Sequence, residues 1–306
     1  MLASILDSLV RPAEERSTPI TDFFLNRVLA ATGRGNELKG SSIEKRTAIE
    51  RALAADDALC DTVGLSWIDV PDDIHCVGPR HNLGDFYSAD LAAEILSGNK
   101  ITLPEGARLL DFGCSSGRLV RMLARYYINA ECYGCDPRDA SIQWAQANLP
   151  EGHFFVSSEV PPLSDIPNSF FRLVIAISVW SHFSATRALK WFREMERIIE
   201  PGGALIFSTH GYCSIEYFTS RMKNQGHSLI PANFSARRQA LDKGDYHFAG
   251  YPRDSAQAKE LDVKNWGMAY VSDRWYRAQL ESRWRFVEIL PGRLLKNQDV
   301  YCLVRL

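Results

Sequence analysis

The stretch Arg108-Leu-Leu-Asp-Phe-Gly-Cys-Ser-Ser-Gly-Arg-Leu-Val120 constrains the fold more than any other part of the chain. Its first half is apolar, as in a buried strand, and Asp111 stands at the carboxyl end of that strand. Gly113 and Gly117 bracket the bend that follows, because glycine lets the chain turn tightly and lets a ligand approach the main chain closely. The stretch therefore predicts a strand, a glycine turn and a helix.

The turn also predicts what kind of ligand could bind beside it. We expect Ser115 or Ser116 to cap the following helix. The first turn of that helix has unpaired N–H groups and a dipole that favours negative charge. Asp111 can instead accept hydrogen bonds from an ammonium group. A ligand that carries both an amino and a carboxyl group would fit this pairing, and an ordinary structural turn is the alternative interpretation.

The glycine spacing argues against a dinucleotide site. The dinucleotide fingerprint reads G-x-G-x-x-G, and Ser115 stands where its second glycine would fall. A nicotinamide-dependent oxidoreductase is therefore disfavoured.

A second acidic residue follows at the distance expected for a nucleotide-like ligand. The segment 130–136 reads as a strand that ends in Asp136, about 20 residues after Gly117. A carboxylate in this position can hold ribose hydroxyls. Asp136 can also cap a helix over 139–148, and the two roles are compatible.

Strands and helices continue to alternate along the chain. We expect further strands at 152–156, 171–178 and 204–210, the second of them apolar enough to be buried on both faces of a sheet. An amphipathic helix over 188–199 ends before Pro201-Gly-Gly203. This order predicts an α/β fold with a doubly wound parallel sheet.

Two regions lie outside this alternation. Residues 1–100 read as a helical extension, in which the charged run 43–53 is expected to be a solvated helix face, and substrate binding by the extension is the alternative. The segment at about 211–265 is polar, aromatic and too long for a simple connection. We predict that it is a lid or substrate pocket inserted into a domain over 101–306, and a homo-oligomer contact is the alternative.

Composition excludes several classes of function. A net charge of −2 provides no field that would collect nucleic acid. Residues 1–17 lack the basic start of a secretory signal, and no apolar run approaches the roughly 20 residues that span a bilayer. Seven scattered cysteines suit a reducing cytoplasm. Cys132 and Cys135 form a C-x-x-C pair without partners for zinc, so we interpret them as part of a strand.

The motif Asp111-Phe-Gly-Cys-Ser-Ser-Gly-Arg118 resembles the first motif of the class I S-adenosylmethionine-dependent methyltransferases, of the type 11/12 kind, with Ser115 in place of a glycine. The phrases Ser178-Val-Trp-Ser-His182 and Pro201-Gly-Gly203 resemble that family too. The resemblance implies a Rossmann-like seven-stranded sheet that closes with an antiparallel pair, here 284–290 and 299–305. Arg172 departs from the aspartate usual in the fourth strand.

The resemblance implies S-adenosylmethionine as the cofactor and a small molecule as the acceptor. The family pattern places the cofactor along the carboxyl ends of the strands. The candidate cofactor-binding residues are Asp111, Gly113, Cys114, Gly117, Asp136, Pro137, Ser158, Glu159 and Ser178.

Methyl transfer is an in-line displacement, so positioning supplies most of the catalysis. A hydroxyl acceptor benefits from a general base, and histidine has the most suitable ordinary pKa. His182 and His210 both follow predicted strands and are the candidates, whereas a loop-holding hydrogen bond is the alternative role of His182. No spacing demands a metal. We predict O- or N-methylation of a sugar-like or natural-product acceptor, and the alternative is a non-catalytic S-adenosylmethionine-binding module for regulation or assembly.

Overall fold

A computed structural model describes residues 17–33, 40–65, 70, 71, 74, 83–225, 231–251 and 266–306. The segment 1–16, where no secretory signal was expected, and parts of the predicted insertion lie outside these residues. The chain divides into two compact units. We call Glu15–Glu159 with Phe171–Ile175 the N-terminal unit, and Val160–Phe170 with Ala176–Leu306 the C-terminal unit.

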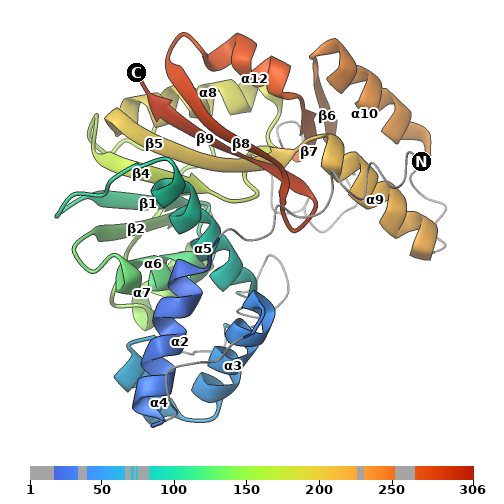
Figure 1. Cartoon of the computed structure of the whole chain (residues 1–306). Helices are drawn as coiled ribbons and strands as arrows, with labels where there is room; N and C mark the ends of the chain where they lie inside the picture. The colour runs from blue at the N-terminus through green and yellow to red at the C-terminus, as the bar shows by residue number, and fades with distance from the viewer. Residues whose placement is uncertain are drawn as a thin grey trace. The chain divides into compact units, whose positions relative to one another are not determined.

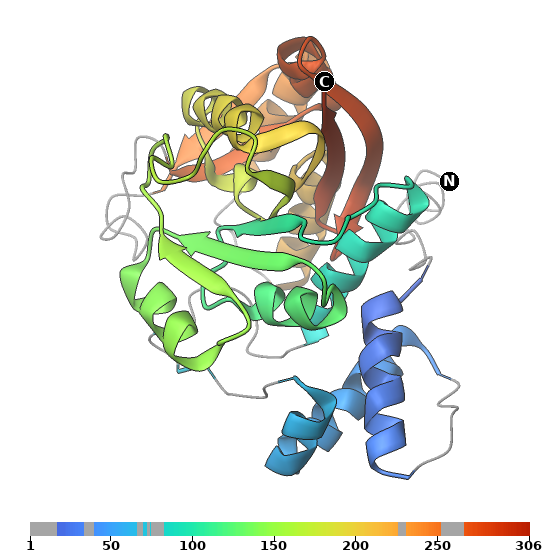
Figure 2. The same ribbon diagram turned by 90° about the vertical axis from the view of Figure 1, so that its left-hand side faces the viewer.

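The N-terminal unit contains parallel strands in the spatial order β3-β2-β1-β4. Helices α6 and α7 connect them and pack on β2, and α7 also contacts β3 (Figure 2). The parallel register places the carboxyl ends of β1 and β2 side by side, since Phe112 pairs with Cys135. The elements are β1 (Arg108–Phe112), α6 (Arg118–Tyr126), β2 (Glu131–Asp136), α7 (Asp139–Asn148), β3 (His153–Val156) and β4 (Phe171–Ala176).

Helices precede these strands, as the sequence predicts for the first hundred residues. They are α2 (Pro19–Ala31), α3 (Ser42–Ala54), α4 (Asp57–Val63) and α5 (Leu83–Gly98).

A buried carboxylate joins three of the helices. Asp90 of α5 accepts hydrogen bonds from Thr21 at the start of α2 and forms a 2.7 Å ion pair with Arg46 of α3. Arg46 is only 3% exposed. The expectation that the charged run of α3 is simply a solvated face was therefore wrong at this residue, because Asp90 provides a buried partner.

The C-terminal unit is built on the long strand β5 (Ile199–His210). Strand β9 (Gln298–Arg305) pairs with β5 and with β8 (Trp284–Leu294), antiparallel in both cases, as Figure 1 shows. This confirms the predicted closing pair. The preceding helix α8 (Ala185–Ile198) ends at the residue before β5 begins, so Pro201-Gly-Gly203 lies inside the strand. The 3-10 helix η1 (Trp180–His182) contacts β5.

The segment after β5 adds secondary structure of its own. Helices α9 (Tyr212–Gln225) and α10 (Pro231–Lys243) precede a hairpin of β6 (Tyr246–Gly250) and β7 (Gly267–Val271), and α12 (Asp273–Leu280) follows. The hairpin joins the carboxyl end of β5 where Tyr270 pairs with His210. Helix α10 packs on both strands of the hairpin (Figure 1). The lid or pocket role and the domain boundaries stay predictions.

The predicted Rossmann-like α/β fold class is confirmed, with parallel strands, an antiparallel closing pair and N-terminal helices. The expected number of seven strands was wrong: the described residues form nine, because the segment after β5 adds β6 and β7. Each described cysteine is free, and Cys132 and Cys135 are buried in β2. Within the described residues, no helix is long and apolar enough to cross a membrane.

Candidate cofactor and acceptor sites

The turn between β1 and α6 requires an unusual backbone. Gly113, Ser115 and Gly117 have φ values of +82°, +50° and +75°. A Cβ added to Gly117 would lie 2.6 Å from the ring of Phe154, which fills the space beside this glycine. Gly117 is therefore required both for its left-handed conformation and for the packing of β3.

Asp136 holds this turn from the neighbouring strand. Its Oδ2 accepts a hydrogen bond from the N–H of Ser115 at 2.9 Å, and its Oδ1 accepts one from the N–H of Arg138 at 2.9 Å. A carboxylate has about four lone-pair sites, so both oxygens can accept further bonds from a ligand. The expected helix cap is not formed, because the N-cap of α7 is Arg138 and no side chain caps that helix. Asp136 instead holds the two backbone N–H groups and keeps capacity for ribose hydroxyls.

Asp111 is the most strongly perturbed acid of the turn. It is 5% exposed, and burial, with a smaller contribution from the charge of Asp136, raises its pKa to about 8. Arg118 at the start of α6 opposes this shift. A ligand ammonium beside Asp111 would supply a nearby cation that favours the ionised carboxylate.

The predicted serine cap of α6 was wrong. The N-cap is Gly117, and no side chain caps the helix. Ser115 lies earlier in the turn, where its N–H faces Asp136. Ser116 is fully buried, and its Oγ has no hydrogen-bond partner. The first helical N–H groups are thus not occupied by a serine side chain.

The remaining candidates of the N-terminal unit occupy different environments. Cys114 is 6% exposed, and burial raises the pKa of its thiol well above the ordinary value. Pro137 is half-buried directly after Asp136. Ser158 is exposed and Glu159 is half-buried, in the loop that begins when Ser157 donates to the carbonyl of Asp136. Cys114 follows β1, Pro137 follows β2, and Ser158 and Glu159 follow β3, in each case at the carboxyl end of the strand.

Ser178 and the two histidines belong to the C-terminal unit. Ser178 has a φ of +65°, and a closed network holds it there. Its N–H donates to Ser208 Oγ at 2.7 Å, Ser208 Oγ donates to Gln298 Oε1 at 2.7 Å, and Gln298 Nε2 donates to Ser178 Oγ at 2.6 Å. The sequence analysis missed Ser208 and Gln298, since no local pattern links residues 90 positions apart.

His182 ends the short helix η1 and is half-buried. Its Nδ1 lies 2.9 Å from the carbonyl of Gly267 and 2.7 Å from the hydroxyl of Tyr251. A carbonyl only accepts, so it favours the tautomer with the proton on Nδ1 and the lone pair on Nε2. Burial lowers the pKa of the ring, so His182 is neutral at pH 7.

His210 is more enclosed, at 2% exposure. Its Nδ1 lies 3.1 Å from the carbonyl of Ala269, and its ring stacks on Tyr270 with centroids 5.2 Å apart. Burial first, and then the charge of His182, lower its pKa to about 3. The rings of His182 and His210 are 6.1 Å apart, so the fold brings the two predicted bases together.

The hairpin extends this arrangement across three strands. Tyr270 pairs with His210 on one side and with His247 on the other. Arg237 of α10 lies over the Tyr270 ring, 4.5 Å from its centroid, and donates to its hydroxyl. We call His210, Tyr270, His247 and Arg237 the basic row. Among the described residues, no group of three metal-ligating side chains forms.

Residues 110–207 match a protein family described as a methyltransferase domain. This span holds the glycine turn, the acidic end of β2 and the strand that leads to His210. The matched span is thus a methyltransferase domain. It covers about a third of the chain and agrees with the predicted class I S-adenosylmethionine-dependent methyltransferase family and its cofactor.

The chain is similar to several curated methyltransferases. It is 28% identical over 123 residues to the trans-aconitate 2-methyltransferase of Variovorax paradoxus, a match that covers 37% of this chain but only 42% of that relative. It is 26% identical over 193 residues to a ubiquinone biosynthesis O-methyltransferase of Xanthomonas campestris, which covers 60% of this chain and 74% of the relative. The two relatives are named for different substrates, so they do not define an acceptor.

Solved structures are more distant. The crystal structure of magnesium protoporphyrin IX methyltransferase from Synechocystis with bound SAH is 15% identical, with a TM-score of 0.48, and covers 76% of this chain and 92% of that one. A protein from Pyrococcus horikoshii is also 15% identical, with a TM-score of 0.48, over 71% of this chain and 90% of the other. No substrate is inferred from likeness at this level.

Proposed function

We propose that this protein transfers the methyl group of S-adenosylmethionine to an oxygen or nitrogen atom of a small sugar-like or natural-product acceptor. In this step the carbon–sulfur bond of the sulfonium breaks as the bond from the acceptor atom to the methyl carbon forms. Sulfur keeps the electron pair and leaves as S-adenosylhomocysteine, and the acceptor loses a proton. The relatives named as small-molecule methyltransferases support this acceptor class.

The glycine turn is the observation that carries the proposal. We assign Asp111 to the amino group of the cofactor, the N–H groups at the start of α6 to its carboxylate, and the oxygens of Asp136 to its ribose. Each assignment rests on chemistry present in the turn: a buried acid, a helix start without a side-chain cap, and an acid that keeps free lone pairs. Cys114, Pro137, Ser158, Glu159 and Ser178 are assigned to the surroundings of the cofactor.

We assign the general base to His182 rather than His210. The carbonyl of Gly267 holds the His182 proton on Nδ1, so Nε2 can accept the acceptor proton. His210 is almost fully enclosed and has a pKa of about 3, which makes it a weak base at neutral pH. We assign His210 to positioning, because its ring packs between Tyr270 and His182.

The test is a titration followed by a turnover assay on the full chain. Calorimetry with S-adenosylmethionine, S-adenosylhomocysteine and NAD is expected to show binding of the first two only. A panel of hydroxylated and amino acceptors is then screened for formation of S-adenosylhomocysteine. Tight NAD binding without the other two would overturn the proposal, and binding without turnover on any acceptor would favour the non-catalytic module.

A further inference from the structure

Arg237 is a buried cation without an acidic partner among the described residues. It is 9% exposed, and its Nε is buried without a hydrogen-bond acceptor. Its guanidinium lies close to two aromatic rings, 4.7 Å from the centroid of Phe234 and 4.5 Å from that of Tyr270. The rings stabilise the charge, and one N–H donates to the Tyr270 hydroxyl, but no described carboxylate accepts from the remaining donors.

Two histidines near Arg237 are affected by its positive charge, and one of them offers a further hydrogen-bond donor. The charge of Arg237 helps to lower the pKa of both His210 and His247, after burial as the main cause. His247 Nε2 is a second buried atom without a hydrogen-bond partner. Since one ring nitrogen of a neutral histidine is a donor, His247 can contribute a second hydrogen bond to an anion.

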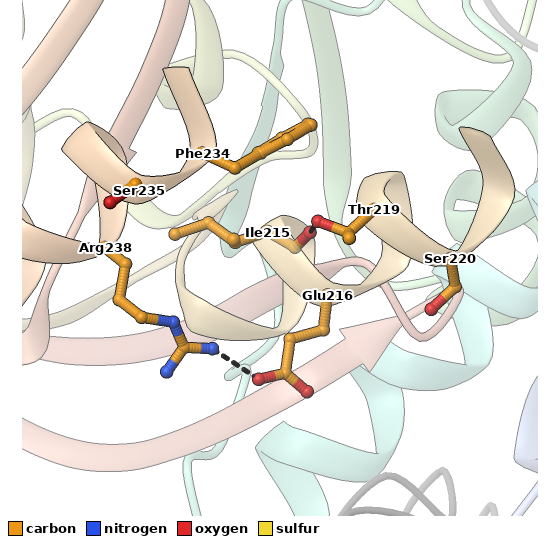
Figure 3. Close-up of a pocket in the computed structure, with 7 residues that line it drawn as sticks. All are labelled: Ile215, Glu216, Thr219, Ser220, Phe234, Ser235 and Arg238. Atoms are coloured by element: carbon orange, nitrogen blue, oxygen red, sulfur yellow. Dashed lines mark hydrogen bonds and ion pairs between the residues drawn. The ribbon is translucent and has the colours of Figure 1, made fainter. Parts of the chain in front are cut away.

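The next arginine on the same helix, Arg238, is paired with a carboxylate and provides a comparison. Arg238 is exposed and forms a 2.5 Å ion pair with Glu216 of α9. Figure 3 shows this pair beside a pocket of about 470 Å³ between α9 and α10. The cation of that pocket is already neutralised, so the pocket does not need an anion, whereas Arg237 is neutralised by no described carboxylate.

We propose that the acceptor carries a carboxylate and that Arg237, assisted by His247, binds it from the inserted segment. Arginine suits this role because its planar fork can donate two parallel hydrogen bonds to a carboxylate. The inference rests on the proposed function and restricts the acceptor to molecules with a carboxylate. Arg237 becomes a specificity-determining residue of the basic row. The inference also assigns the inserted segment to acceptor recognition.

The test compares a carboxylate probe with its neutral isostere. Benzoate and benzamide are titrated into the full chain saturated with S-adenosylhomocysteine, and binding is followed by ligand-observed NMR. We expect benzoate to bind at least about 10-fold more tightly than benzamide, and Arg237→Gln to remove about 10- to 100-fold of benzoate affinity. Arg237→Lys should retain part of the preference, because it keeps the charge and loses the fork.

Arg238→Gln is the matched control, since it removes the same charge one residue away and should leave benzoate affinity unchanged. Equal binding of the two probes, no benzoate binding, or equal losses in both glutamine variants would overturn the inference. If Arg237→Gln does not fold, the benzamide comparison in the unaltered chain and in Arg237→Lys decides. Failure of the proposed function is distinguishable, because it would abolish S-adenosylhomocysteine binding or turnover, whereas the benzoate preference is also measured in the chain without S-adenosylhomocysteine.

Discussion

The glycine turn of the N-terminal unit and the basic row of the C-terminal unit use burial in opposite ways. In the turn, burial raises the pKa of Asp111 to about 8, and in the row it lowers the pKa of His210 to about 3. Both shifts favour the neutral form in the absence of a ligand. An ammonium group beside Asp111 would favour its ionised form. An anion at Arg237 would offset the positive charge that contributes to the lowered pKa of His210. The two regions therefore suit ligand groups of opposite charge.

The regions also differ in how they are assembled. The turn is built from residues 111–117 and from Asp136 on the next strand, so one local motif and one neighbour complete it. The basic row needs a strand, a helix and a hairpin, and Arg237 reaches Tyr270 over 33 positions of sequence. We therefore expect substitutions in the turn to reduce cofactor binding and substitutions near the row to reduce turnover.

The largest effect is expected for Gly117→Ala. The left-handed backbone costs about 1–2 kcal/mol for a residue with a Cβ, and the clash with Phe154 adds about 1–3 kcal/mol. Urea unfolding and S-adenosylhomocysteine calorimetry measure the loss of stability and of binding. Gly106→Ala is the control, because Gly106 has a similar φ of +74° and open space around it. Equal losses in the two variants would show that the Phe154 contact is unimportant.

The next effect concerns turnover. His182→Ala is expected to lower kcat by about 100-fold while cofactor affinity stays unchanged, because the variant lacks the lone pair that accepts the acceptor proton. Steady-state kinetics with an acceptor found in the screen measure this, and the pH profile should lose its acidic limb. A normal kcat would remove His182 as the base. His210→Ala is the comparison: reduced turnover together with a lower melting temperature identifies it as a positioning residue.

Asp136→Ala is expected to weaken S-adenosylhomocysteine binding by about 30-fold, since it removes both the ribose acceptor and the bond that holds Ser115. Isothermal titration calorimetry gives the ratio directly. Asp139→Ala is the control, because Asp139 is an exposed acid at the start of α7 whose partner is Gln143. If both variants bind as the unaltered chain does, Asp136 acts only on the backbone.

The smallest effect is a pH dependence of stability. The folded pKa of Asp111, about 8, lies above its ordinary value of 3.8, so the protonated acid stabilises the fold. This contribution is complete below about pH 4 and is lost as the pH rises to about 8. Asp111→Asn should therefore remove about 1 kcal/mol of the decline in unfolding free energy between about pH 7 and 8. Asp139→Asn is the control, because Asp139 is an exposed acid outside the turn. An unchanged slope in Asp111→Asn would refute the assignment.

The sequence by itself determined the α/β alternation and the glycine turn, and the closing strand pair followed from its resemblance to a known family. The first two features depend on local signals: apolar runs, two glycines and acids that end strands. The sequence could not determine the N-cap of α6. Gly117 takes that position in a left-handed conformation and packs against Phe154 of β3, a contact that local sequence does not reveal.

Only the tertiary structure decided how the C-terminal unit arranges its candidate residues. The register of β5, β7 and β6 places His210, Tyr270 and His247 in one row, and helix packing lays Arg237 over it. No periodicity links these residues, because strand pairing and helix docking join segments that are distant in sequence. The cofactor was predicted from a local motif, whereas the proposed carboxylate-binding role of Arg237 rests on its buried position without an acidic partner among the described residues.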